Sequence, residues 1–244
     1  MTKVDVLGVK FDRQTMAEFM TTFTTRIAKH QGTFVVTANP EIVMFARKNP
    51  AFAQLLADKA DFITADGIGV VRGAAMLNTP LPERVTGYDL MINLLEYAEE
   101  QQLKIALVGA KASVNQQAAE KVQTNYPHIK IVYTHDGYFD LSDTSVQQDL
   151  IASQPDMVFA ALGFPKQEQF LAAIQPALPA AYLMGVGGSF DVLSGTVKRA
   201  PKLFQQLHLE WFYRLLKQPS RIGRMAELPR FLQAVKQQAK KGQS

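Results

Sequence analysis

Asp66 is the residue of this sequence best placed to carry acid–base chemistry. It follows the apolar, β-branched stretch 62–65, so it should leave a buried strand at its carboxyl end. A partly desolvated carboxylate there can have a raised pKa and accept a proton from a hydroxyl group. The alternative is that Asp66 caps a helix beginning near Gly67, and for this residue taken alone the cap is favoured.

Two further polar side chains lie at the end of the β-branched stretch 33–38: Thr37 is its last residue but one, and Asn39 follows it directly. Ligands of a parallel α/β sheet bind outside the carboxyl ends of its strands, and a hydroxyl beside an amide suits a sugar-like polyol. The alternative for Asn39 is a turn, because Asn before proline is a common turn dipeptide.

Two glycine-containing segments could accept an anion. In 163–168, proline near a helix start would put Gln167 and Glu168 in the first turn, beside unpaired backbone N–H groups; plain helix initiation is an equal alternative. In 185–191, glycines would allow the backbone to approach a nucleotide diphosphate. That segment is not a G-x-G-x-x-G fingerprint, so by itself it is weak evidence.

Several chemistries are excluded by residues that the sequence lacks. It has no cysteine, no Asp-x-Asp pair and no G-x-S-x-G elbow, and its four histidines have no metal-ligand spacing. We therefore expect no metal ion and no cofactor. The sequence also opens without a secretory signal and contains no apolar run of about 18 residues, so we expect nothing that spans a membrane.

Positive charge gathers at the end of the chain. Residues 198–244 hold eleven lysines and arginines against two glutamates, a net charge of +9, whereas the remainder carries −5. Such asymmetry suggests an anionic partner: nucleic acid, a phospholipid surface or a phosphorylated substrate. The alternative is a solvated basic helix packed through the aromatic residues 211–213.

The elements that must position these groups alternate between strand and helix patterns, which predicts βαβ units and a parallel sheet. Strands are expected at 4–9, 33–38, 61–65, 104–108, 129–134, 157–162 and 181–184. Helices are expected at 15–29, 41–47, 51–59, 67–77, 86–101, 113–125, 146–152, 166–174 and 207–217, with a last amphipathic helix around 228–235. The fold class is thus α/β, a Rossmann-like parallel sheet flanked by helices, with a catalytic domain at 1–196 and a basic helical C-terminal appendage at 197–244.

Seven segments in order along nearly the whole chain carry a resemblance. They are TANPE (37–41), TADGIG (64–69), RVTGYD (84–89), GFPKQE (163–168), GVGGSFD (185–191), RAP (199–201) and LEW (209–211), followed by Arg214, Pro219, Arg221 and Arg224. With these segments the chain resembles the WecG/TagA/CpsF family of bacterial glycosyltransferases, above all its teichoic-acid branch. The resemblance implies inverting, metal-independent transfer of N-acetylmannosamine from UDP to N-acetylglucosamine on undecaprenyl diphosphate, forming a β-1,4 linkage.

The resemblance also implies roles for individual residues. Asp66 would be the general base toward the acceptor 4-hydroxyl, and the acceptor would be held by Thr37, Asn39 and Arg84. The UDP pocket would be lined by Gly109, Tyr138, Gln167, Gly187, Gly188 and Asp191. With no metal, diphosphate charge would be neutralised by Arg214, Arg221 and Arg224.

The implied partners are a UDP-sugar donor, a polyprenyl-diphosphate-linked acceptor and an anionic membrane surface, at the inner face of the cell membrane on the cytoplasmic side. A homo-oligomer is left open. One rival is a transferase of the same family that uses another sugar, such as the uronic acid of N-acetylmannosamine or glucose. The other, ranked far lower, is a non-enzymatic nucleotide- or nucleic-acid-binding module; the basic tail lacks a recognised nucleic-acid motif, so we expect no nucleic-acid partner.

Overall fold

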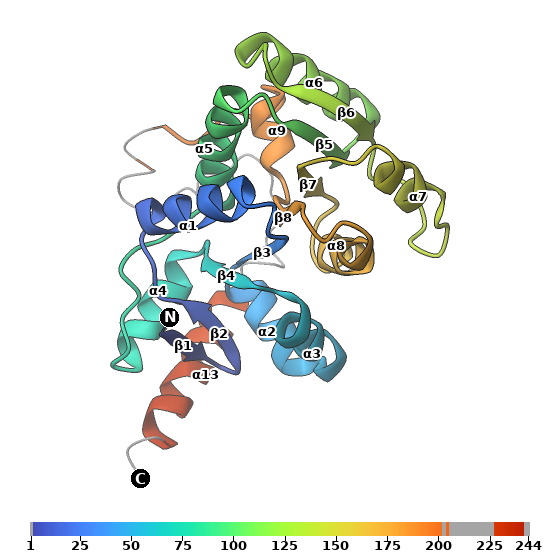
Figure 1. Ribbon diagram of the computed structural model, residues 1–244. Coiled ribbons are helices and arrows are strands. Elements are labelled where there is room, and N and C mark those ends of the chain that lie inside the picture. Colours follow the sequence, from blue (N-terminus) through green and yellow to red (C-terminus); the bar gives the residue numbers. More distant parts are fainter. Residues whose placement is uncertain (1, 202–203, 205–226, 242–244) are drawn as a thin grey trace.

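A six-stranded parallel sheet forms the centre of the protein in the computed structural model, which describes residues 2–201, 204 and 227–241 (Figure 1). Along the sheet the strand order is β4-β3-β8-β7-β5-β6, and every neighbouring pair is parallel. The strands are β3 (Thr33–Ala38), β4 (Phe62–Ala65), β5 (Lys104–Gly109), β6 (Lys130–His135), β7 (Met157–Ala161) and β8 (Tyr182–Gly185). The expected α/β, Rossmann-like class is confirmed.

Helices cover both faces of this sheet. Alternate residues of β3 point to opposite sides, so Phe34 and Val36 join one buried apolar cluster while Val35 joins the other. The first cluster is covered by α2 (Pro40–Lys48), α3 (Pro50–Lys59), α4 (Ile68–Met76), α7 (Ser145–Ala152) and α8 (Lys166–Ile174). The second is covered by α1 (Met16–Ala28), α5 (Gly87–Glu100), α6 (Ala112–Asn125) and α9 (Ser189–Leu193); a short 3₁₀ turn, η1 (Gln175–Ala177), follows α8.

The N-terminal strand expected at 4–9 is wrong in its extent. The chain instead forms two short antiparallel strands, β1 (Lys3–Val6) and β2 (Val9–Asp12), outside the parallel sheet. The reason is the turn between them: Leu7 and Gly8 both have positive φ, 56° and 91°, which reverses the chain. The hairpin is joined to the main sheet by the buried Asp12 carboxylate, which accepts the Ile63 N–H at 2.8 Å.

The last helix, α13 (Glu227–Lys241), confirms the amphipathic pattern around 228–235. Its Phe231 and Val235 are fully buried in the first apolar cluster, and its Gln238 Oε1 accepts the Leu7 N–H at 3.0 Å. Two glycines of α4 make room for it: a Cβ on Gly73 would lie 3.0 Å from the Phe231 ring. Figure 1 shows α13 beside the β1–β2 hairpin, so the end of the expected appendage packs on the body.

None of the helices in the described part of the chain has the length and hydrophobicity that a membrane span requires.

Candidate active site

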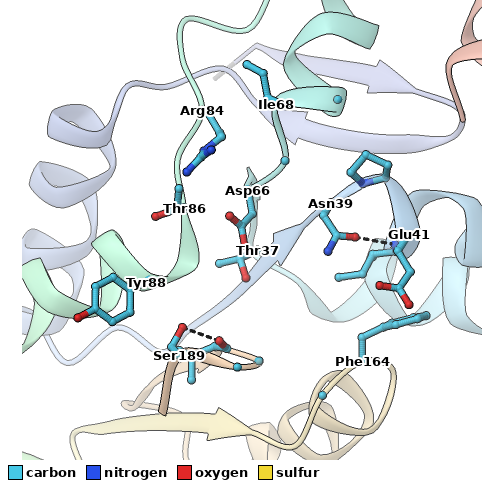
Figure 2. Close-up of a pocket in the computed structure, with 18 of the residues that line it drawn as sticks. Thr37, Asn39, Glu41, Asp66, Ile68, Arg84, Thr86, Tyr88, Phe164 and Ser189 are labelled. Atoms are coloured by element: carbon cyan, nitrogen blue, oxygen red, sulfur yellow. Dashed lines mark hydrogen bonds between the residues drawn. The ribbon is translucent and has the colours of Figure 1, made fainter. Parts of the chain in front are cut away.

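A cavity of about 360 Å³ opens at the carboxyl edge of the sheet. The segments that follow β3, β4, β7 and β8 line it, together with residues before and within α5 and two residues from late in the chain. Its lining includes every acceptor-side residue expected from the sequence and the expected base: Thr37, Asn39, Asp66 and Arg84. Figure 2 shows Asp66, Arg84 and Thr37 directed toward the same space.

Asp66 leaves β4 as expected. Its backbone N–H donates to the Ala38 carbonyl at 3.0 Å, which holds the start of this loop against the end of β3. The N-cap position of α4 is occupied by Gly67, so the cap alternative for Asp66 is not the observed arrangement. The carboxylate is part of the cavity lining, where a substrate hydroxyl can reach it.

Arg84 reaches the same place from a loop between α4 and α5. The loop is held there because the Val85 N–H donates to the carbonyl of Ala65 at 3.0 Å, and Ala65 is the residue directly before Asp66. A guanidinium at this position can contact an anionic group of a substrate.

Thr37 and Asn39 are both held by the protein. The Thr37 hydroxyl, almost buried, donates to the Gly185 carbonyl at 3.1 Å and so connects the ends of β3 and β8. Asn39 caps α2, with its Oδ1 accepting the Ile42 N–H at 3.0 Å (Figure 2). Its structural role is therefore a helix cap, and its side chain still belongs to the cavity lining.

Gln167, Gly187 and Gly188 also line the cavity. The Gly187 N–H donates to Gln167 Oε1 at 3.0 Å. The Gln167 backbone N–H donates to the Gly163 carbonyl at 2.9 Å. The N–H of Gln167 is therefore not among the unpaired groups that this first turn could offer to an anion, and the anion site itself stays a prediction.

Three residues expected at the UDP pocket lie outside this cavity lining: Gly109, Tyr138 and Asp191. Gly109 is the last residue of β5, and Tyr138 lies in the loop after β6. The loops after these two strands are in contact, since the Gly137 N–H donates to the Ala110 carbonyl at 2.8 Å. Tyr138 is 75% exposed. Asp191 lies in the first turn of α9, after β8. Their role in donor binding stays a prediction.

Glu168 lies in the first turn of α8 as expected, but it does not line the cavity and is only 1% exposed. Burial raises its pKa from 4.5 to about 7. Nothing in the local pattern separates it from an ordinary surface glutamate of a first turn.

Other lining residues were not assigned a role from the sequence. They are Glu41, Thr86, Tyr88, Phe164, Ser189, Arg199 and Leu228. Arg199 forms an ion pair with Asp89 at 2.7 Å, and its guanidinium carbon lies 4.9 Å from the centre of the Tyr88 ring. The TGYD segment (86–89) is the sequence signal for this side of the cavity: Thr86 caps α5, Tyr88 lines the cavity, and Asp89 pairs with Arg199.

The arginines expected at the diphosphate lie outside the described residues: Arg214, Arg221 and Arg224. Within the described ranges, no three histidine, aspartate or glutamate side chains gather in a way that could hold a metal ion. The metal expectation stays a prediction.

A carboxylate in a cavity at the carboxyl edge of a parallel sheet lies where such sheets bind ligands, and it can accept a proton from a hydroxyl group. Comparison with known proteins identifies the class further. The sequence model of the glycosyl transferase WecG/TagA/CpsF family matches residues 4–244, so the chain belongs to this family and is a glycosyltransferase.

Two relatives carry the same enzyme name, N-acetylglucosaminyldiphosphoundecaprenol N-acetyl-beta-D-mannosaminyltransferase. A protein of Bacillus spizizenii is 44% identical over 212 residues, covering 87% of this chain and 82% of the relative. One of Staphylococcus aureus is 40% identical over 232 residues, covering 94% and 91%.

Proposed function

We propose that this enzyme transfers N-acetylmannosamine from UDP-N-acetylmannosamine to the 4-hydroxyl of N-acetylglucosamine on undecaprenyl diphosphate. The names of the relatives support the acceptor and the transferred sugar. The observation that carries the chemistry is the placement of Asp66 at the end of β4, in one cavity with Thr37, Asn39 and Arg84.

In this reaction Asp66 accepts the proton of the acceptor 4-hydroxyl as its oxygen attacks the anomeric carbon of the donor. The bond between that carbon and the UDP oxygen breaks, and its electron pair leaves on UDP. Attack from the side opposite UDP inverts the anomeric configuration. General-base assistance of this kind contributes about 10²–10⁴-fold to the rate.

Cationic side chains take the place of a metal ion in this proposal. Arg84 and Arg199 line the cavity. To these we add three arginines of the basic C-terminal segment 198–244, called the tail, which lie outside the described residues: Arg214, Arg221 and Arg224. Each changed singly to Glu should keep the thermal unfolding midpoint and lose transfer; if all three variants remain active, the tail is not part of the site.

The same tail supports binding to an anionic membrane surface at the inner face of the cell membrane. Its net charge is +9, and each Lys or Arg near such a surface contributes about 1 kcal/mol. The fraction of the protein that sediments with phosphatidylglycerol vesicles should therefore fall as salt is added. Equal binding to neutral vesicles would contradict an electrostatic surface.

Mass spectrometry of the product tests the proposed activity directly. The enzyme is incubated with a short-chain lipid diphosphate that carries N-acetylglucosamine. Each sample contains one donor: UDP-N-acetylmannosamine, its uronic acid or UDP-glucose. The expected result is a disaccharide lipid from UDP-N-acetylmannosamine alone. A product from another donor instead would support the rival sugar, and no product from any donor would overturn the proposal.

A further inference from the structure

A buried carboxyl group, that of Glu168, lies next to Gln167, a residue of the cavity lining. Glu168 is 1% exposed, and its Oε1 accepts a hydrogen bond from Gln167 Nε2 at 2.9 Å. Its Oε2 is buried and has no hydrogen-bond partner among the residues that the structure describes. An apolar side chain of similar length would avoid the cost of burying this group, so stability alone gives no reason for it.

Gln167 connects this carboxyl to the cavity. Its Oε1 accepts the Gly187 N–H at 3.0 Å while its Nε2 donates to Glu168. A flipped amide would set the NH₂ group against the Gly187 N–H, two donors facing each other. The two hydrogen bonds together therefore select one orientation of the Gln167 amide.

The Gln167 amide also lies directly against the end of β8. A Cβ on Gly185 would be 2.6 Å from Gln167 Nε2, which leaves glycine as the residue that fits there. The carbonyl of Gly185 in turn accepts the Thr37 hydroxyl. A continuous set of contacts thus runs from Glu168 through Gln167 to Gly185 at the end of β8 and to Gly187, whose backbone lines the cavity.

We propose that Glu168 is a positioning residue, which holds the Gln167 amide in one orientation and through it keeps the loop after β8 in the arrangement that receives the UDP part of the donor. It does not touch the cavity and is not a catalytic residue. The inference rests on the proposed function, because it assumes a UDP-sugar donor at this wall.

Two substitutions separate this role from simple packing. Glu168→Gln keeps a carbonyl oxygen for Gln167 Nε2, so UDP affinity and the KM for the donor should stay within about 2-fold. Glu168→Met fills similar space without an acceptor. Loss of this hydrogen bond should weaken UDP binding and raise the donor KM about 10-fold, with the acceptor KM unchanged.

Leu171→Met, in the buried face of the same helix, is the matched control for altered packing. We expect it to leave the donor KM unchanged, and Glu168→Met to keep at least the wild-type thermal unfolding midpoint. Wild-type donor KM in Glu168→Met would overturn the inference. So would an equal rise in Leu171→Met, or a loss in Glu168→Gln as large as in Glu168→Met.

Two measurements keep the test decisive. In the unaltered protein, the side-chain amide signal of Gln167 in ¹⁵N-labelled samples should be slow to exchange with solvent; rapid exchange of both amide protons would overturn the inference even if Glu168→Met failed to fold. Calorimetry with UDP alone needs no transfer. If the unaltered protein binds UDP but transfers no sugar, the proposed activity is wrong. The role of Glu168 is then still tested by whether Glu168→Met binds UDP more weakly than the unaltered protein. Absence of UDP binding overturns both.

Discussion

The buried carboxyl of Glu168 should make the stability of the protein fall as the pH rises. In the folded state its pKa is raised from 4.5 to about 7 by burial, so between these values the folded protein holds a proton that the unfolded chain releases. Stability decreases with pH wherever the folded state binds more protons. The loss begins near pH 4.5, grows by about 1.4 kcal/mol per pH unit and levels off above pH 7.

The magnitude follows from the same two values. Integrated from pH 5 to pH 8, the shift corresponds to a loss of about 2–3 kcal/mol in the free energy of unfolding. Glu168→Gln cannot ionise, so it should lack this loss, while the contributions of all other groups cancel in the comparison.

Urea unfolding of both proteins at pH 5 and pH 8, followed by circular dichroism, measures the difference. The wild type should lose about 2–3 kcal/mol more of its free energy of unfolding than Glu168→Gln across this range. Glu100→Gln, at an exposed position of α5, controls for the removal of one negative charge. Identical pH dependence of wild type and Glu168→Gln, or a wild type that gains stability toward pH 8, would refute the reasoning.

The remaining predictions concern the site and its support. Asp66→Asn should lower transfer by about 10²–10⁴-fold and keep UDP binding by calorimetry; a near-wild-type rate would show that Asp66 is not the base. Transfer should persist in excess EDTA, because the sequence has no Asp-x-Asp; activity lost on chelation and restored by Mg²⁺ would contradict this. Gly109→Ala should cost more than about 2 kcal/mol in urea unfolding, since φ is +125° and the new Cβ would lie 2.3 Å from the Ala161 carbonyl carbon; an unchanged midpoint is the contrary result. Phe231→Ala should lower the free energy of unfolding, measured in urea, by about 3–5 kcal/mol, because Phe231 of α13 is buried in the first apolar cluster. A loss under about 1 kcal/mol would show that α13 does not pack there.

Local pattern was enough to predict the elements that bring the central residues together. The β-branched stretch 33–38 is a strand with those bounds, and Asp66 follows the strand that pairs beside it. Because the carboxyl ends of parallel strands meet at one edge of a sheet, Thr37, Asn39 and Asp66 could be expected in one place before the strand order was known. The prediction held because it required only the direction of the strands.

The parts of the site that the sequence could not predict depend on contacts between distant segments. Arg84 lies beside Asp66 because the Val85 N–H pairs with the end of β4, and no periodic pattern marks such a bond. The turn at Leu7 has a positive φ in a residue that seldom adopts it, so the local pattern predicts one strand where the structure has two.

By itself the sequence determined the α/β class, the places where strands end and the polar residues set at those ends, since these follow from side-chain type and local periodicity. Only the tertiary structure decided that Glu168 is buried against Gln167, that Gly109 and Tyr138 lie apart from the cavity, and that the last helix packs beside the first hairpin. The physical reason is that burial and pairing arise where remote segments meet. A glutamate, a glycine or an amphipathic helix has the same local pattern whichever surface it finally contacts.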